Sequence, residues 1–203
     1  MKRLLDQVAL PLDSTDEKLQ YVLDRLAITD VFNRFFLAID NKDWQAAGEC
    51  VTDPFTMLVP NNLWGDPTLD GNPVSRAEWV TALELRNTGW YQTLHTHPNE
   101  LVVIDGDAAH LGSYQVVPHS VGLLPEDTYT SWGFYDVDLK RCGDQWKVER
   151  VEIQPRLVEN IADIPRIHTR VAATSGEVGW KLRALSGLQW AIAFTTLSRR
   201  SRH

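Results

Sequence analysis

The sequence has 203 residues, enough for one domain with an extension, and its 43% hydrophobic and 23% charged content is ordinary for a globular protein that folds in water. It holds 27 Asp and Glu against 20 Lys and Arg, a net charge of −7, and this acidic balance argues against a nucleic-acid-binding domain. Because no stretch reaches the ~18 uninterrupted apolar residues of a membrane span, and the N-terminus lacks the apolar core of a signal peptide, we expect a cytoplasmic protein without an integral membrane segment.

The first element that the sequence predicts is a long helix over residues 15–40. Ser14 and Glu17 have the S-x-x-E spacing of a capping box, which marks a helix start. Apolar residues then recur at helical spacing as far as Ile39. The helix is expected to end at Asp40, where an acid is unfavourable because the C-terminal end of a helix carries negative partial charge. Asp40 is therefore either solvated or used by the fold.

Shorter elements follow the long helix. In chain order they are a helix over roughly 43–50, a strand at 54–60, a loop at 60–74 rich in Pro, Asn, Gly and Asp, and a helix from 75 to about 87. The last of these begins with a second capping box, formed by Ser75 and Glu78.

From Thr93 onward the sequence favours antiparallel strands. Asp105-Gly106 is the favoured turn pair of a tight hairpin. A second pair of strands, TYTSWGFYDVDL and QWKVERVEI, is joined by a turn at 141–144. The alternation of the second strand slips near Glu149–Arg150, which predicts a bulge. Helices followed by long antiparallel strands indicate an α+β fold in which a curved sheet wraps around helices.

The last segment differs in charge from the rest. Residues 165–203 contain seven basic residues and a single acid, Glu177, and the apolar spacing over 177–198 predicts a helix. We expect one domain over residues 1–164 and a C-terminal helical extension over 165–203. The extension is expected to be a lid or an oligomer contact, with a helix on a membrane surface as a third possibility.

Three histidines lie where the sheet is predicted. His95 and His97 have the same parity, so they face one side of a strand if no bulge intervenes. His119 ends the following strand, which the hairpin at 105–106 brings alongside. Two imidazoles that face one cavity can hold one proton between them, one acting as base and the other as acid. A buried carboxylate such as Asp40 can orient an imidazole and stabilise its charged form.

Metal binding is a competing use of these residues. His-x-His spacing on a strand occurs in metal sites, but no further ligand motif accompanies it, and Cys50 and Cys142 have no metal or redox spacing. We expect neither a metal nor another cofactor. Plain interpretations also stand: a solvated helix-end acid for Asp40, an exposed strand position for one of the paired histidines, and an ordinary loop residue for His119.

The order of elements and several short motifs resemble the NTF2-like, or SnoaL-like, superfamily of cone-shaped α+β barrels, with scytalone dehydratases the most similar members. The motifs are AIDNKDW at 38–44, TLH at 93–95, VVPH at 116–119 and QWK at 145–147, and the resemblance covers roughly residues 15–158. It implies a curved mixed or antiparallel sheet around the N-terminal helices. It also implies Asp40 as the pocket carboxylate, His95 as the first imidazole and His119 as the second, with His97 as the alternative to His95.

The resemblance implies a cofactor-independent lyase of secondary metabolism, and a homo-oligomer, dimer or trimer. Its substrate would be a small hydrophobic cyclic carbonyl compound of polyketide or terpenoid type, which loses water or undergoes a related isomerisation or cyclisation. Candidate substrate-binding residues are Tyr135, Trp132, Tyr114, Phe36, Trp64 and Phe55. Ile39 stands where the dehydratases have a tyrosine, which leaves the substrate and the exact reaction open. The alternative is a non-catalytic member that binds a ligand or a partner.

Overall fold

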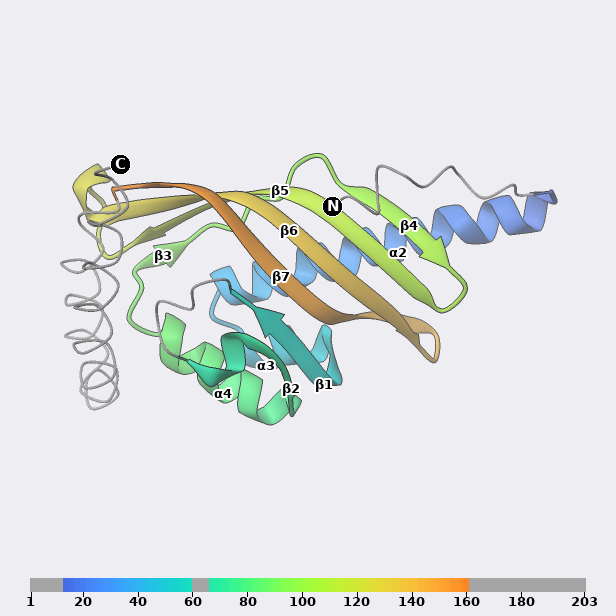
Figure 1. The fold of residues 1–203 in the computed structure, drawn as a ribbon, viewed down its shortest axis with the longest axis horizontal. Helices are drawn as coiled ribbons and strands as arrows, with labels where there is room; N and C mark the ends of the chain where they lie inside the picture. The colour runs from blue at the N-terminus through green and yellow to red at the C-terminus, as the bar shows by residue number, and fades with distance from the viewer. Residues whose placement is uncertain (1–12, 60–65, 161–203) are drawn as a thin grey trace, which may run out of the picture.

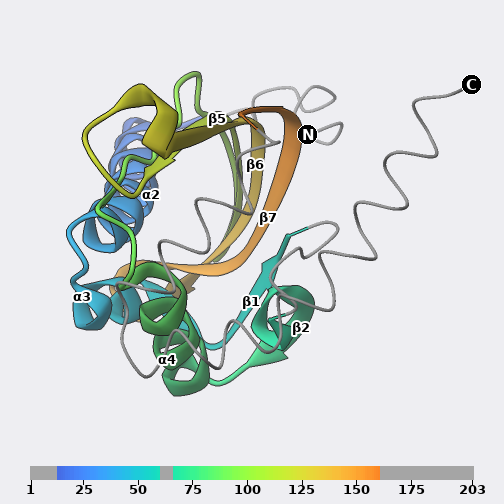
Figure 2. The ribbon, with the colours of Figure 1, turned by 90° about the vertical axis from the view of Figure 1, so that its left-hand side faces the viewer.

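The computed structural model describes residues 13–59 and 66–160, which form helices packed against one curled sheet (Figures 1 and 2). The helices are α2 (Thr15–Asp40), α3 (Trp44–Glu49) and α4 (Arg76–Asn87), with short 3-10 helices η1 (Pro67–Leu69) and η2 (Pro125–Asp127). The strands are β1 (Val51–Leu58), β2 (Asp70–Val74), β3 (Gln92–Thr93), β4 (Leu101–Asp105), β5 (Ala108–Ser120), β6 (Thr128–Cys142) and β7 (Gln145–Glu159).

The sheet has seven strands in the order β2-β1-β7-β6-β5-β3, with β4 paired to β5. All pairs are antiparallel except β1 with β7, which run parallel, so the sheet is mixed. In Figure 2 the long strands curve around an interior that the helices close from the other side. The α+β cone predicted from the sequence is confirmed.

Helix α2 begins and ends where the sequence predicts. The hydroxyl of Ser14 accepts from the backbone N–H of Glu17 at 3.1 Å, and the carboxylate of Glu17 accepts from the backbone N–H of Ser14 at 2.9 Å. The helix turns Phe32, Phe35 and Phe36 into the core, where they are almost fully buried. This aromatic face forms one wall of the interior. A second capping box, at Ser75 and Glu78, opens α4 as predicted.

Local signals also fix the hairpins. Strand β4 ends at Asp105 and β5 begins at Ala108, and these two residues pair across the turn. The predicted bulge in β7 is confirmed, because Asp138 pairs with Arg150 while its neighbour in β6 pairs with Val148, which leaves Glu149 as the extra residue.

Strand β2 was not predicted. The stretch 70–74, assigned to a loop from its Gly and Pro content, pairs antiparallel with β1 at the edge of the sheet. An edge position tolerates Pro73, which has no backbone N–H to donate. Strand β1 also begins earlier than expected, at Val51, where it pairs with β7.

The sheet has one inward and one outward face, and strand parity decides which residues lie on each. In β5 and β6 the odd-numbered residues are the buried set, among them Leu111, Ser113, Gln115, Val117, Tyr135, Val137 and Leu139. Tyr114 and Trp132, at even positions, are 47% and 39% exposed. They lie on the outward face, where Tyr114 packs against Phe134 with ring centroids 5.2 Å apart.

Two expectations lie outside the described residues: the C-terminal helical extension over 165–203, with the domain boundary at 164, and the position of Trp64. Within the described part of the chain, no helix is both long and apolar enough to cross a membrane.

Candidate active site

Asp40, the last residue of α2, holds the segment that carries His95. Its Oδ1 lies 2.6 Å from Nδ1 of His95 and accepts a hydrogen bond from the hydroxyl of Thr93 at 2.7 Å. Its Oδ2 accepts from the backbone N–H of His95 at 2.8 Å. Both carboxylate oxygens therefore join the end of a helix to β3 and the residues after it.

The environment of Asp40 keeps it ionised. Burial raises the pKa of its carboxyl, but the hydrogen bonds from His95 and Thr93 and the charge of the imidazole outweigh burial, and the net pKa lies below the ordinary value. An ionised Asp40 accepts the proton on Nδ1 of His95. The Nε2 atom of His95 is then the ring nitrogen left to exchange a proton with a ligand.

Strand pairing brings His119 next to His95. Thr93 is the register partner of His119, and Thr96 forms a bridge with Val116. The rings of His95 and His119 are arranged edge to face, with centroids 5.9 Å apart and an interplanar angle of 75°. The pairing inferred from the hairpin at 105–106 therefore agrees with the structure.

Aromatic rings hold both imidazoles. His119 is stacked on Tyr129 with centroids 4.7 Å apart and an interplanar angle of 3°, and its ring also contacts that of Trp90, with centroids 5.2 Å apart. Burial raises the pKa of Tyr129, so its phenol is neutral at any ordinary pH. His95 is stacked on Phe36 with centroids 4.8 Å apart.

His97 shares the inward side of the segment with His95 but belongs to a separate pair. Its Nδ1 lies 2.8 Å from Oε1 of Glu100, whose other oxygen accepts from the hydroxyl of Thr29 at 2.9 Å. Its ring contacts Phe36 at a centroid distance of 5.5 Å. No hydrogen bond joins His97 to Asp40 in the described residues. Strand parity could not distinguish His95 from His97, and the structure does, because each is paired with a different carboxylate.

A cavity of about 90 Å³ lies beside the two imidazoles. Its lining is mainly apolar and aromatic: Phe36, Ile39, Met57, Val59, Leu69, Leu83, Arg86, Asn87, Trp90, His95, His119, Tyr129 and Ile153. Apolar walls with a few polar side chains are typical of ligand-binding sites.

Arg86 is the charged lining residue that sequence reasoning missed. It lies in the last turn of α4 with its side chain only 10% exposed, and its Nη1 donates to the carboxylate of Asp66 and to the hydroxyl of Thr68. Burial lowers the pKa of Arg86 despite the opposing effect of Asp66. Burial raises the pKa of Asp66, but Arg86 and Thr68 outweigh it and the net pKa is lowered. The two groups form an ion pair.

The candidate substrate-binding residues lie in different parts of the structure. Phe36 lines the cavity, and Tyr135 is fully buried against Phe36 at a centroid distance of 4.7 Å, where burial and the charge of Asp40 raise the pKa of its hydroxyl. The expectation for Tyr114 and Trp132 is wrong, because both lie on the outward face of the sheet. The prediction that Phe55 binds the substrate is wrong as well, because Phe55 does not line the cavity.

Phe55 belongs to the core beneath the cavity. Its ring packs against Trp79 and Phe35, with centroid distances of 4.8 and 6.2 Å, and it is fully buried. The residues of β1 that reach the cavity are Met57 and the adjoining Val59.

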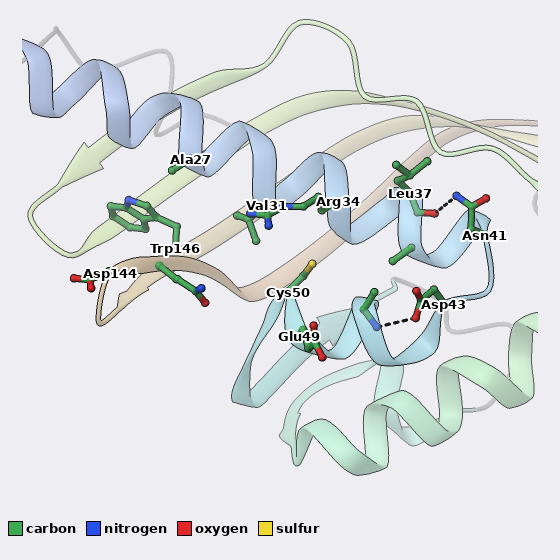
Figure 3. Close-up of a pocket in the computed structure, with 13 residues that line it drawn as sticks. Ala27, Val31, Arg34, Leu37, Asn41, Asp43, Glu49, Cys50, Asp144 and Trp146 are labelled. Carbon is green, nitrogen blue, oxygen red and sulfur yellow. Dashed lines mark hydrogen bonds between the residues drawn. The ribbon is translucent and has the colours of Figure 1, made fainter.

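A larger hollow of about 580 Å³ lies elsewhere, between α2, α3 and the β6–β7 turn (Figure 3). Its lining includes Arg34, Leu37, Glu49, Cys50 and Trp146, and it contains neither imidazole. We place the candidate site at the smaller cavity because His95 and His119 line that one. Over residues 13–59 and 66–160, no group of three or more His, Cys, Asp and Glu side chains is arranged to hold a metal.

Comparison with known proteins gives a family and several structural relatives. A family model described as a SnoaL-like domain matches residues 20–152. Protein Kfla4162 from Kribbella flavida is 26% identical, with a TM-score of 0.61, covering 69% of this chain and 95% of its own. No curated protein matches the chain.

Two further relatives are similar in fold at lower identity. A candidate scytalone dehydratase from Novosphingobium aromaticivorans is 16% identical, with a TM-score of 0.57, and the match covers 69% of this chain and 89% of that one. The type 3 hexachlorocyclohexane dehydrochlorinase LinA from Novosphingobium barchaimii is 16% identical, with a TM-score of 0.57, covering 72% of this chain and 96% of that one.

Proposed function

Because the chain belongs to the SnoaL-like family of the NTF2-like superfamily, we propose that it is a cofactor-independent enzyme that removes a proton next to a carbonyl group. The reaction is a dehydration of a small cyclic carbonyl compound, of polyketide or terpenoid type, or a related isomerisation or cyclisation. The superfamily includes cofactor-independent dehydratases and isomerases, which supports this class of chemistry. A cytoplasmic location and a homo-oligomer stay predictions.

The observation that carries the proposal is the row Asp40, His95, His119 beside the cavity. Oδ1 of Asp40 lies 2.6 Å from Nδ1 of His95, and the ring centroids of His95 and His119 are 5.9 Å apart. A carboxylate that fixes one nitrogen of an imidazole leaves the other nitrogen as a base of defined direction. A second imidazole at this separation can act on another atom of the same small ligand.

In the proposed dehydration His95 is the base. Its Nε2 takes the proton from the carbon next to the carbonyl, and the electrons of that C–H bond form the new double bond. His119 gives a proton to the departing hydroxyl, whose C–O bond breaks, and water leaves. Asp40 stabilises the imidazolium form of His95. General acid–base catalysis of this kind contributes roughly 10²–10⁴-fold.

The walls of the cavity support the same chemistry. Ile39, Met57, Leu69 and Ile153 surround the imidazoles with apolar atoms, so a bound ligand would displace water from the site. Charge interactions are stronger where water is excluded, and a reactive enol is protected from side reactions.

Proton abstraction can be tested without knowing the natural substrate. A panel of cyclic ketones, 2-tetralone among them, is incubated with the protein in D₂O, and deuterium incorporation next to the carbonyl is followed by NMR. Cyclic 3-hydroxy ketones report water loss through the ultraviolet absorbance of the enone. Asp40→Asn should lose both deuterium exchange and water loss, and His119→Ala should lose water loss, while circular dichroism shows an intact fold in each. Full activity in both variants would end this mechanism.

A non-catalytic, ligand-binding role is the second candidate. It is favoured by one observation: both oxygens of Asp40 are engaged with His95 and Thr93, as in a purely structural connection. In that case the ketones bind, as calorimetry would show, yet no deuterium enters any of them.

A further inference from the structure

We propose that Arg86 binds the carbonyl oxygen of the ligand that occupies the cavity, and so sets which end of the ligand faces the imidazoles. The inference rests on the proposed function for the presence of a carbonyl group. The inference goes beyond the proposed function by assigning the residue that binds the carbonyl oxygen and the orientation of the ligand. Arg86 lines the same cavity as His95 and His119, and it comes from a different element, α4.

The hydrogen bonds of Arg86 leave part of its guanidinium for a ligand. Within the described residues both of its bonds run through Nη1, to Asp66 and Thr68. A guanidinium has five N–H donors and no acceptor, so Nε and Nη2 still offer donors. The bonds to Asp66 and Thr68 fix the plane of the group, which reduces the entropy lost when another acceptor binds.

The other polar groups of the cavity cannot supply this charge. The side-chain amide of Asn87 donates to the carbonyl of Leu83 at 2.8 Å, at the end of its own helix. Tyr129 is a neutral phenol. Among the described lining residues, Arg86 is the one with a permanent positive charge. When a proton leaves the carbon next to a carbonyl, negative charge develops on the carbonyl oxygen, and a fixed cation there stabilises it.

Charge balance favours a neutral carbonyl over a carboxylate ligand. Asp40 and Asp66 both have lowered pKa values and are ionised. A carboxylate would bring a third negative charge to a site that holds one permanent cation, whereas a ketone or aldehyde adds none until the reaction begins. The expected ligand class is therefore a small, largely apolar ketone or aldehyde.

The test uses cyclohexanone labelled with ¹³C at its carbonyl carbon, and methylenecyclohexane as a ligand of the same shape without the oxygen. Affinity is measured by calorimetry and the carbonyl resonance of the bound ketone by NMR. A hydrogen bond from a guanidinium withdraws electrons from the carbonyl carbon and moves its resonance downfield. Arg86→Met should abolish this shift and weaken cyclohexanone binding roughly tenfold or more, with methylenecyclohexane unaffected.

Variants separate a binding role from a structural one. Arg86→Met leaves Asp66 buried without its cation, so the double variant Asp66→Asn with Arg86→Met is made as well and should show the same loss. Arg76, on the same helix, has a side chain that is 39% exposed, and its Nη2 lies 3.9 Å from Oδ2 of Asp53. Arg76→Met therefore serves as the matched control and should bind both ligands normally.

Each outcome decides the proposal. It is overturned if the wild-type protein causes no downfield shift at saturating ketone, if the double variant keeps the shift, or if both ligands lose affinity equally. If the shift depends on Arg86 but no protein form exchanges deuterium next to the carbonyl, the inference stands and the proposed enzymatic function fails.

Discussion

The carboxylate of Asp40 binds His95 twice, at its ring Nδ1 and at its backbone N–H, at 2.6 and 2.8 Å. An acid at a helix C-terminus is disfavoured by roughly 0.3–1 kcal/mol, while a hydrogen bond to a charged group contributes roughly 1.5–3 kcal/mol. The bonds to His95 and Thr93 therefore outweigh the unfavourable position. The helix end and the short strand that carries His95 are held as one unit.

Asp40→Asn is expected to lower stability at neutral pH and to flatten the acid side of the stability profile. The pKa of Asp40 is lower in the folded state than in the unfolded chain, so its contribution is fully present above the unfolded pKa, about 3.9, and is lost as pH falls below it toward the folded value. Urea denaturation between pH 2 and 7 measures this, with about 1–3 kcal/mol lost at neutral pH.

The control for this experiment is Asp30→Asn, an exposed acid on the same helix. It should follow the wild-type profile at every pH. An Asp40→Asn protein whose stability falls with acid as steeply as that of the wild type would show that the carboxylate does not stabilise the folded state.

Substitution of the two neighbouring histidines should have unequal effects. His95→Asn removes the imidazole bound to Asp40 and is expected to lower ketone deuterium exchange by roughly 10²–10⁴-fold. His97→Asn removes an imidazole paired with Glu100 and should change exchange far less, because that pair is separate from Asp40. The measurement is the deuterium-exchange rate of each variant, made under conditions in which both variants are fully folded. Equal losses would mean that the separation of the two pairs has no functional meaning.

Asp24→Ala should destabilise the protein by about 2–3 kcal/mol. The carboxylate of this buried residue accepts from Nη2 of Arg141 at 2.7 Å and from the indole N–H of Trp146 at 3.0 Å, which pins α2 to the β6–β7 hairpin. The hydrogen bond from Arg141 is the main cause of the lowered pKa of Asp24.

A matched control for Asp24 is available on the same arginine. Asp107 lies 3.0 Å from Nε of Arg141, but its side chain is 81% exposed, so Asp107→Ala should cost no more than about 0.5 kcal/mol. Thermal denaturation of both variants gives the comparison, and similar losses would contradict the assigned role of burial.

Gly133→Ala should cost about 3 kcal/mol or more, or prevent folding. A Cβ at Gly133 would lie 2.2 Å from the backbone oxygen of Gln154, where β6 and β7 shift register. At Gly106, with φ +59°, a Cβ meets nothing within 4 Å, and Gly106→Ala should cost roughly 1–2 kcal/mol from backbone strain alone. A Gly133→Ala protein as stable as Gly106→Ala would refute the predicted clash.

The parts of the fold that the sequence predicts well are those with local signals. The capping box at Ser14, the Asp105-Gly106 turn and the slip at Glu149 each depend on a few neighbouring residues, and the structure has all of them. Strand β2 has no such signal. Its sequence, DGNPV, becomes a strand because an edge of β1 accepts it, which is a property of the assembled sheet.

The site follows the same division. His95 and His119 could be brought together from the hairpin register, and Asp40 was assigned to the same site by the resemblance to the scytalone dehydratases. Tyr114 and Trp132 were assigned to the wrong face although a signal existed, since Tyr114 has the opposite parity to His119 on the same strand. Arg86 had no usable signal: a basic residue in the last turn of a helix is ordinary, and Asp66, its partner, is 20 residues away in sequence.

The stacking of His119 on Tyr129 and of His95 on Phe36 has a spectroscopic consequence. A proton held above an aromatic face is shielded by the circulating electrons of that ring, so the carbon-bound ring protons of both imidazoles should resonate upfield. His110, which is paired with Asp138, has no aromatic ring stacked on it among the described residues. The imidazoles of His95 and His119 are therefore distinguished from that of His110 in an NMR spectrum, and the protonation of each ring can be followed separately.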